Sequence, residues 1–214
     1  QLKPGLATSW TPIDDTTWEF KIREGVKFHD GSPLTAKDVK FSIERIPVVT
    51  GPMPMTLYTK YVETAEVVDD YTLRVKTKGV APSLPNDFTR LFVVSANTGM
   101  EARNEQFNSG EKAIGTGPYK FVSWQPKGDL VLVRNDDYWG GAPHWKNVVR
   151  KEIADDAARV AALRSGQVDL INYVPASDYV GFKNDKALDT FISDSVYILN
   201  VQPTVKDVLP QKVK

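Results

Sequence analysis

The stretch GTGPYKFVSW, residues 115–124, divides the chain into two parts of different pattern. Two glycines and a proline favour a sharp change of direction. They lead directly into alternating apolar residues, which are typical of a half-buried strand. Residues before this stretch read as hairpins and one capped helix, and residues after it as a mixture of strands and helices. We therefore predict that the chain passes from one lobe into the next at residues 115–118.

The first part begins with predicted strands. Residues 17–23 alternate strictly, with Trp18, Phe20 and Ile22 on one face, which predicts a half-buried strand. A second short strand is expected at residues 26–28. Residues 67–76 read as a hairpin that turns at the two aspartates 69 and 70.

A helix is expected to begin at Thr35, because Asp38 stands three residues later, where its carboxylate can reach back to the first turn. Pro47 ends it, since proline disfavours helical geometry in the residue before it. Residues 82–88 predict a short helix and residues 91–94 a compact apolar strand. Residues 97–112 are polar and predict a surface excursion.

The second part begins with a predicted hairpin of residues 120–124 and 130–134, joined by a five-residue loop. Another strand is expected at residues 148–153. An alanine-rich helix follows the two aspartates 155 and 156 and stops at Gly166.

A buried strand is expected at residues 168–171, because a short apolar run follows the helix stop. Strand, helix and strand in this order favour a mixed, partly parallel sheet, hence an α/β fold. A short helix near residues 177–183 and a final strand at residues 195–201 complete the prediction.

Composition excludes several classes of function. The chain has 41% hydrophobic and 25% charged residues, as soluble globular proteins do. Its 27 basic and 27 acidic residues give a formal net charge of zero, which argues against nucleic-acid partners and electrostatic membrane anchors. Without cysteine there is no thiolate chemistry and no disulfide. No apolar run approaches the roughly 18 residues of a membrane helix, so direct membrane insertion is not expected.

Neither catalysis, nor a metal, nor a cofactor is indicated by the residue pattern. The two histidines, His29 and His144, have no partner at metal-ligand spacing. The paired aspartates at 14–15, 69–70, 136–137 and 155–156 stand at predicted turns or helix starts. The glycines of residues 115–117 lack the lysine and the longer spacing of a phosphate loop.

Four blocks, in order, resemble one family of proteins. They are TWEFKIREGVKFHDGSPLTAKDV (17–39), GTGPY (115–119), RNDDYW (134–139) and AARVAALRSGQVDL (157–170). This set resembles the dipeptide and oligopeptide solute-binding proteins of ABC importers, the bacterial extracellular solute-binding proteins of family 5. The resemblance covers nearly the whole chain, from about residue 6 to residue 207.

The resemblance implies a fold and an architecture. The fold would be part of a type II periplasmic-binding-protein-like fold, with a mixed sheet, flanking helices and a smaller attached subdomain. Residues 1–112 would be the attached subdomain of lobe one, residues 113–202 the central part of that ligand-facing lobe, and residues 203–214 an irregular tail. The second lobe would be absent, so that the 214 residues alone should bind ligand poorly or not at all.

The resemblance also implies a function. The protein would capture a small ligand, a peptide by first expectation, without covalent chemistry, and deliver it to an ABC permease in the membrane. Its location would be periplasmic or extracellular and associated with the cell envelope or a lipid.

Three places are candidates for ligand contact. The first is the end of the predicted strand that follows the alanine-rich helix, with Asn172, Tyr173 and Val174, since ligands sit at strand ends in open α/β sheets. The other two follow from the resemblance. They are the apolar loop with Met53, Met55 and Tyr58, and the last predicted strand with Tyr197 and Asn200.

Two other classes of function stay open at this point. One is a hydrolase of peptides or glycans that uses an acidic pair, such as Asp136 or Asp155 with its neighbour. The other is an interaction module that binds a protein and no small ligand. Turnover of a fluorogenic substrate would distinguish the first, and tight protein capture the second.

Overall fold

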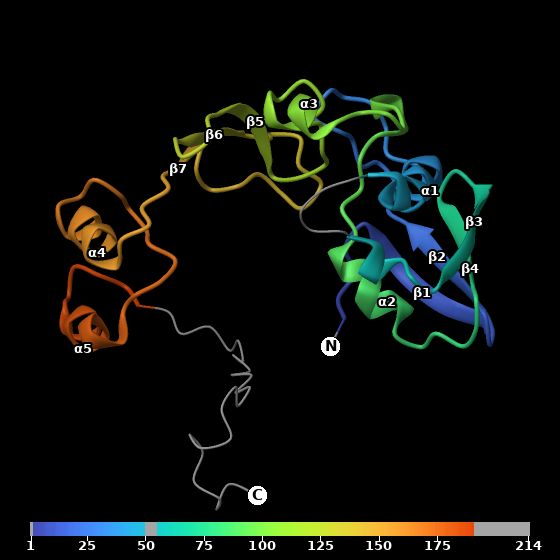
Figure 1. Ribbon diagram of the computed structural model, residues 1–214, viewed down its shortest axis with the longest axis horizontal. Helices are drawn as coiled ribbons and strands as arrows, with labels where there is room; N and C mark the ends of the chain where they lie inside the picture. The colour runs from blue at the N-terminus through green and yellow to red at the C-terminus, as the bar shows by residue number, and fades with distance from the viewer. Residues whose placement is uncertain (1, 50–54, 191–214) are drawn as a thin grey trace, which may run out of the picture. The chain divides into compact units, whose positions relative to one another are not determined.

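The computed structural model describes residues 2–49 and 55–190 (Figure 1). The chain forms two compact units, Gln1–Glu152 and Ile153–Lys214. Across the described ranges, every helix is too short or too polar to cross a lipid bilayer.

A four-stranded antiparallel sheet forms the core of the first unit. Its strands are β1 (Ala7–Asp14), β2 (Thr17–Ile22), β3 (Val62–Asp69) and β4 (Thr72–Thr77), in the order β1-β2-β4-β3. The alternation of β2 directs Phe20 and Ile22 into the core, where each is at most 5% exposed. The predicted strand at 17–23 and the hairpin with its turn after residue 69 are therefore confirmed, whereas β1 is an element that the sequence pattern did not predict.

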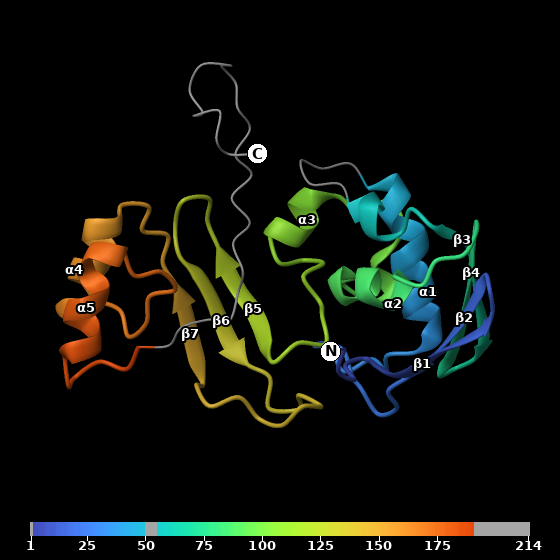
Figure 2. The ribbon, with the colours of Figure 1, turned by 90° about the horizontal axis from the view of Figure 1, so that it is seen from below.

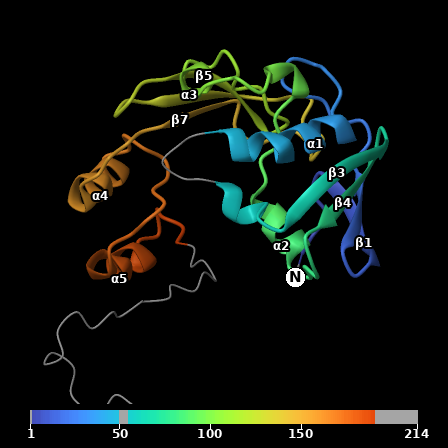
Figure 3. The same cartoon turned by 45° about the vertical axis from the view of Figure 1, so that its right-hand side comes forward.

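Helix α1 (Ala36–Arg45) packs against β3 and β4 (Figure 3). The Asp38 carboxylate reaches back as expected, accepting the Thr35 backbone N–H at 2.8 Å. A carboxylate in the first turn also suits the positive end of the helix dipole. After Arg45 the chain tightens into the 3₁₀ turn η1 (Ile46–Val48), so the helix ends just before Pro47.

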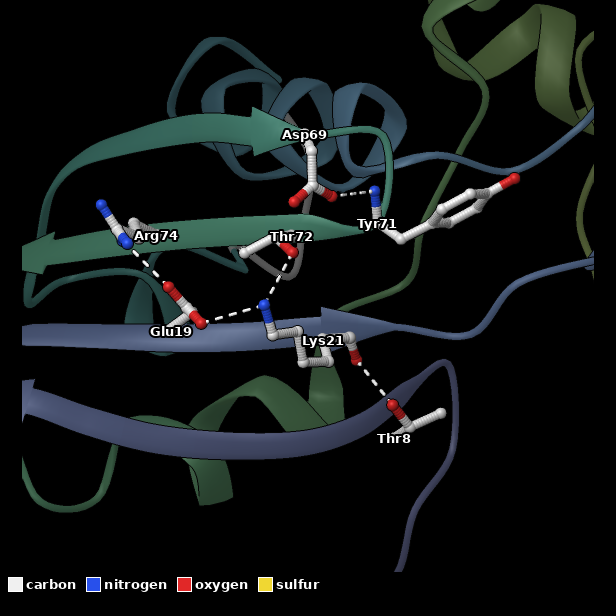
Figure 4. Close-up of polar contacts among 7 residues, drawn as sticks. All are labelled: Thr8, Glu19, Lys21, Asp69, Tyr71, Thr72 and Arg74. Carbon is white, nitrogen blue, oxygen red and sulfur yellow. Dashed lines mark hydrogen bonds and ion pairs between the residues drawn. The ribbon is translucent and has the colours of Figure 1, made fainter.

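The opposite face of this sheet is polar and carries its own network (Figure 4). The Glu19 carboxylate on β2 accepts a hydrogen bond from Arg74 Nε on β4 at 3.0 Å and pairs with Lys21 Nζ at 3.1 Å. Lys21 Nζ also donates to Thr72 Oγ1 at 2.9 Å. Hydrogen bonds from Lys21 and Arg74 lower the pKa of Glu19 below its ordinary value of 4.5. This face is thus a solvated outer surface.

The first unit also contains several short helical elements, one before β3 and the others after β4. These are η2 (Met55–Tyr58), α2 (Leu84–Asp87), η3 (Phe88–Arg90), η4 (Ala96–Thr98) and α3 (Asn104–Asn108). The short helix expected at 82–88 is confirmed by α2. The predicted strand at residues 91–94 is wrong, because the backbone groups of Val94 bond to the Ser42 side chain of α1 and not to a neighbouring strand.

A second antiparallel sheet follows, with β5 (Tyr119–Trp124), β6 (Leu130–Arg134) and β7 (Asn147–Arg150) in that order (Figure 2). The predicted hairpin is confirmed, and its loop turns through Lys127 at φ 63°. The third strand begins and ends earlier than predicted. All the strand pairs of the described residues are antiparallel, so the prediction of a partly parallel sheet is wrong for that part of the chain.

The residues 115–118, which join the two sheets, are bonded from both sides. The His29 ring accepts the Gly115 N–H at Nδ1 (3.3 Å) and contacts the Gly117 carbonyl through Nε2 (3.0 Å). Buried Asn135 donates from Nδ2 to the same Gly117 carbonyl at 3.1 Å. The His29 backbone N–H also donates to the Gly115 carbonyl, at 2.8 Å. His29 therefore joins two segments that are distant in the sequence.

The second unit contains α4 (Asp156–Arg164) and α5 (Ala176–Asn184). Asp155 caps α4 by accepting the Ala158 N–H at 2.7 Å, and Gly166 follows its end at φ 72°, both as the sequence predicts. The predicted strand at 168–171 is wrong, because this segment stays close to the end of the helix: the Val168 N–H donates to the Ala162 carbonyl. The predicted strand at 195–201 lies outside the described residues.

Candidate functional site

The first candidate group lies on a short 3₁₀ turn of the first unit. Met55 and Tyr58 are the ends of η2 and are both half-buried, while Leu57 between them is 59% exposed. The predicted apolar loop therefore presents part of its apolar surface to solvent. Met53 lies outside the described residues.

The second candidate group lies in the second unit, in the segment between α4 and α5. Asn172 and Tyr173 are exposed and Val174 is half-buried. These residues do not stand at a strand end, so the strand-end argument that made them candidates for ligand contact does not hold. What they offer is an exposed phenol ring and a side-chain amide beside the helix pair.

A cation accompanies this group. The Arg159 guanidinium lies 5.7 Å from the centre of the Tyr173 ring, within the range of a cation–π contact. It donates from Nη1 to the Ile153 carbonyl at 2.9 Å and from Nη2 to the Asp156 carboxylate. Its Nε is buried and has no hydrogen-bond partner among the described residues. The arrangement combines an aromatic surface with a hydrogen-bond donor.

The third candidate group, Tyr197 and Asn200, lies outside the described residues, and its role stays a prediction. The first two groups belong to different compact units. Within each unit the structure places the candidate side chains on turns and connecting segments, where binding residues are common.

A buried polar stripe on α1 was missed by the sequence reasoning. It consists of Asp38, Ser42 and Arg45, which are 6%, 3% and 8% exposed. Asp38 Oδ1 accepts the Ala96 N–H at 2.9 Å, and Ser42 Oγ accepts the Val94 N–H at 2.9 Å. The spacing of 4 and 3 residues puts all three on one helix face, a signal that was present in the sequence.

Arg45 completes the polar stripe at the end of α1. Its Nη2 donates to the Ala102 carbonyl, and its guanidinium lies 5.0 Å from the centre of the Phe107 ring. Burial lowers the pKa of Arg45 below its ordinary value. The polar stripe thus holds the backbone of residues 94–102 against the helix, through contacts to Val94, Ala96 and Ala102.

A cavity of about 330 Å³ lies in the first unit on the apolar side of the four-stranded sheet. Apolar side chains of Trp10, Phe20, Val39 and Phe88 line it, with Leu91 and Val93. Phe20 and Phe88 stack with ring centres 5.2 Å apart. Its apolar lining suits an apolar group and offers little for polar chemistry.

The acidic pairs have structural partners. Asp136 Oδ1 accepts a hydrogen bond from Arg134 Nε at 2.7 Å, and Asp155 caps α4. Asp14 and Asp69 accept backbone N–H groups within their own turns, and these bonds, those of Thr16 and Tyr71 first, lower the pKa of each carboxyl. Within residues 2–49 and 55–190, no three His, Cys, Asp or Glu side chains gather as metal ligands would.

Comparison with known proteins decides the family. Residues 1–209 match the middle region of the bacterial extracellular solute-binding proteins, family 5. The chain belongs to this family. The resemblance carried by the four sequence blocks is thereby confirmed.

Relatives of family 5 agree with this assignment. The chain is 33% identical over 209 residues to the oligopeptide-binding protein AppA of Bacillus subtilis, covering 92% of this chain and 38% of that protein. It is 30% identical over 189 residues to the probable D,D-dipeptide-binding periplasmic protein DdpA of Escherichia coli, covering 86% and 36%. The chain thus spans a little over a third of the length of these relatives.

Solved structures of the family confirm the fold. NikZ of Campylobacter jejuni, in complex with Ni(L-His), is 26% identical with a TM-score of 0.75; the match covers 87% of this chain and 38% of that one. DppA of Helicobacter pylori, in complex with the peptide STSA, is 28% identical with a TM-score of 0.71, covering 87% and 41%. The chain therefore has part of a type II periplasmic-binding-protein fold, with mixed helix and sheet.

Proposed function

We propose that this chain is part of an extracytoplasmic solute-binding component of an ABC importer, which captures a peptide-like ligand without covalent chemistry. The observation that carries the proposal is the family match over residues 1–209. Two relatives bear names that refer to peptide binding, and a solved neighbour holds a peptide. The permease partner follows from the importer function, and an envelope or lipid association is a further part of this proposal.

The mechanism is enclosure between two lobes by a hinge motion. We propose that residues 1–112 are the attached subdomain and residues 113–202 the central part of the ligand-facing lobe. The proposed ligand contacts are the three places that the sequence analysis named. They are Met55 and Tyr58 in the apolar loop, then Asn172, Tyr173 and Val174, and finally Tyr197 and Asn200.

No enzymatic activity is part of this proposal. The Asp136 carboxylate is bonded to Arg134, and the Asp155 carboxylate is bonded to the first turn of α4. A general acid needs a carboxyl that is free to exchange its proton with a substrate. These bonds therefore favour a binding protein over a hydrolase.

The test uses the protein as its source cell produces it. Its melting temperature is measured with a panel of di-, tri- and tetrapeptides, with Ni–histidine and with cellobiose, and calorimetry follows for any compound that raises it. A ligand at a hundred times its Kd stabilises the folded state by about 2.7 kcal/mol, which is a readily measured shift. Peptides should raise the melting temperature, whereas cellobiose should not.

Two outcomes would contradict the proposal. A shift with Ni–histidine and with no peptide would replace the peptide by a metal chelate. Turnover of a fluorogenic peptide that is lost in Asp136→Asn or Asp155→Asn would favour a hydrolase instead.

A further inference from the structure

The side chain of His29 makes two contacts whose partners can act in only one way. Its Nδ1 lies 3.3 Å from the Gly115 backbone nitrogen, and its Nε2 lies 3.0 Å from the Gly117 carbonyl oxygen. A backbone N–H can only donate a hydrogen bond, and a carbonyl oxygen can only accept one. Nδ1 must therefore be unprotonated, and Nε2 must carry the hydrogen. These two contacts fix the ring as the neutral Nε2–H tautomer.

Protonation of this ring would break one of the two contacts. A protonated imidazole carries a hydrogen on both nitrogens, so Nδ1 could no longer accept the Gly115 N–H. The Nε2–H bond to the Gly117 carbonyl would persist. So would the bond from the His29 backbone N–H to the Gly115 carbonyl at 2.8 Å. Acid should therefore loosen the joint of residues 115–118 without detaching it.

The ring is accessible to protons, but the backbone on each side of it is held. His29 is half-buried, so water reaches its side chain. Phe28 before it is 2% exposed, and the Phe28 N–H donates to the Ser32 carbonyl at 2.8 Å. Across the joint, buried Asn135 donates from Nδ2 to the Gly117 carbonyl at 3.1 Å. Because both segments are held, a small backbone movement does not relieve the conflict that protonation creates.

One acidic side chain acts on the charge of the ring. Hydrogen bonds from Ser32 lower the pKa of Asp30 most, and positive charge on His29 lowers it further. By the same interaction, the Asp30 carboxylate favours the protonated imidazole. The Gly115 N–H favours the neutral ring, so the two groups oppose each other. Asp30 therefore assists the uptake of the proton that breaks the Nδ1 contact.

The other charged groups around the joint do not change charge near neutral pH. Residues 115–118 have no titratable side chain. Lysines are charged below pH 8, so Lys27 and Lys112, which precede the two bonded segments, add a constant charge. On the turn after β6, Arg134 Nε and Asp136 Oδ1 are bonded to each other at 2.7 Å. Histidine has an ordinary pKa of about 6.5, which makes it the side chain suited to respond to mild acid.

We propose that His29 makes the joint of residues 115–118 acid-sensitive: uptake of one proton at Nδ1 removes the Gly115 contact and loosens the connection between the two sheets. The bonds require the neutral ring, so its contribution to holding the joint is present at pH values above about 6.5 and is lost as the pH falls. This inference does not rest on the proposed function, because no ligand takes part in it.

The first measurement observes the two ring nitrogens directly, by NMR of the whole protein labelled with ¹⁵N. At pH 8, the chemical shift of His29 Nδ1 should be that of an unprotonated nitrogen and the shift of Nε2 that of a protonated one. At pH 5, both should have the shift of a protonated nitrogen. Exposed His144 is the control, and at pH 8 its two nitrogens should show shifts averaged over both tautomers.

The second measurement follows the Gly115 amide by hydrogen exchange, with the intrinsic pH dependence of exchange divided out. Its protection should fall about tenfold between pH 7.5 and pH 5.5, as a change of one pKa unit would give. The Thr77 N–H, which donates to the Thr16 carbonyl at 2.7 Å in the first sheet, should keep its protection over the same range.

Three variants test which group takes up the proton. His29→Gln keeps an amide that can donate or accept but does not titrate near neutral pH, so Gly115 protection should become independent of pH. His144→Gln, at the exposed histidine, is the matched control and should keep the wild-type pH dependence. Asp30→Asn should move the loss of protection to lower pH, because the carboxylate that favours the protonated ring is gone.

Three results would overturn the inference. They are a protonated Nδ1 at pH 8, equal Gly115 protection at pH 7.5 and pH 5.5 in the wild-type protein, and an unchanged pH dependence in His29→Gln. If that variant does not fold, the nitrogen shifts and the Gly115 amide of the wild-type protein decide. A protein that binds no peptide would contradict the proposed function and leave these results as they are.

Discussion

The two sheets of the first unit have central strands of opposite character. In the four-stranded sheet, β4 is central, and its Leu73 and Val75 are fully buried. In the three-stranded sheet, β6 is equally central, yet all five of its residues are only half-buried. The burial of a strand is therefore not set by its central position in the sheet. It is set by the layer of residues that covers the sheet.

The difference follows from how the two sheets are covered in the described residues. Helix α1 packs on one face of the first sheet, and the other face is polar. In the second sheet, the register puts Phe121, Leu132 and Val148 on one face and Val131 with Val149 on the other. Apolar residues on both faces are typical of a sheet with a layer on each side. The residues of β6 are nevertheless only half-buried in the described part of the chain. Hydrophobic stabilisation per residue should therefore be larger in the first sheet.

The sharpest test of this comparison is a matched pair of truncations. Leu73→Ala empties a fully buried site and should lower the free energy of unfolding by about 2–5 kcal/mol. Leu132→Ala, at the half-buried equivalent on β6, should cost about 1–2 kcal/mol, since less apolar area returns to water. Urea unfolding of each variant measures both. Equal losses would show that the second sheet is as well covered as the first.

The packing of Phe121 can be tested by adding a side-chain atom at the residue it contacts. Gly110 has φ +90°, and a Cβ added there would lie 2.3 Å from Phe121 Cε1. Gly110→Ala should therefore destabilise the fold by about 1–3 kcal/mol, through overlap and through the strained backbone. Gly117→Ala, which meets nothing within 4 Å and has no left-handed φ, is the control. An unfolding midpoint that is unchanged in Gly110→Ala would mean that Phe121 is not packed there.

An isosteric change distinguishes the two sheets without altering volume. Val75→Thr places a hydroxyl in a fully buried position and should cost about 1–2 kcal/mol. Val149→Thr, at a side chain that is 50% exposed, should change stability by less than about 0.5 kcal/mol. Thermal unfolding of the two variants is sufficient. The reverse order would contradict the comparison.

The smallest effect concerns the polar face of the first sheet and depends on pH. The pKa of Glu19 is lowered by the Lys21 and Arg74 hydrogen bonds, so its contribution to stability is present above the pKa of the unfolded chain and is lost as pH falls through the folded value. Glu19→Gln should be slightly less stable than the wild type at pH 7. The two melting temperatures should converge below about pH 4. A difference that persists at pH 2.5 would assign the effect to packing.

The sequence predicted elements whose signals are local. The alternation of apolar and polar residues predicted β2 to within one residue of its observed end. The spacing of Thr35 and Asp38 predicted the start of α1. Asp155 and Gly166 likewise predicted the start and the end of α4, because a cap and a left-handed glycine depend only on neighbouring residues.

The two wrongly predicted strands share a cause. The hydrogen-bond partner of an extended segment lies elsewhere in the chain, so local sequence does not reveal it. Residues 91–94 are apolar enough for a strand, but the Val94 backbone bonds to Ser42, some fifty residues earlier. In residues 168–171, the Val168 N–H bonds back to the Ala162 carbonyl near the end of α4. The polar stripe was overlooked because Asp38 already had a local role as a capping residue, which concealed its bond to the Ala96 N–H.

The joint at residues 115–118 has a mechanical consequence. The three contacts of His29 reach both Gly115 and Gly117, so a pulling force between the sheets would load them together and not one after another. Bonds loaded in parallel fail in a single step at high force. In single-molecule stretching, the two sheets should therefore separate in one rupture, and His29→Ala should lower the force of that event.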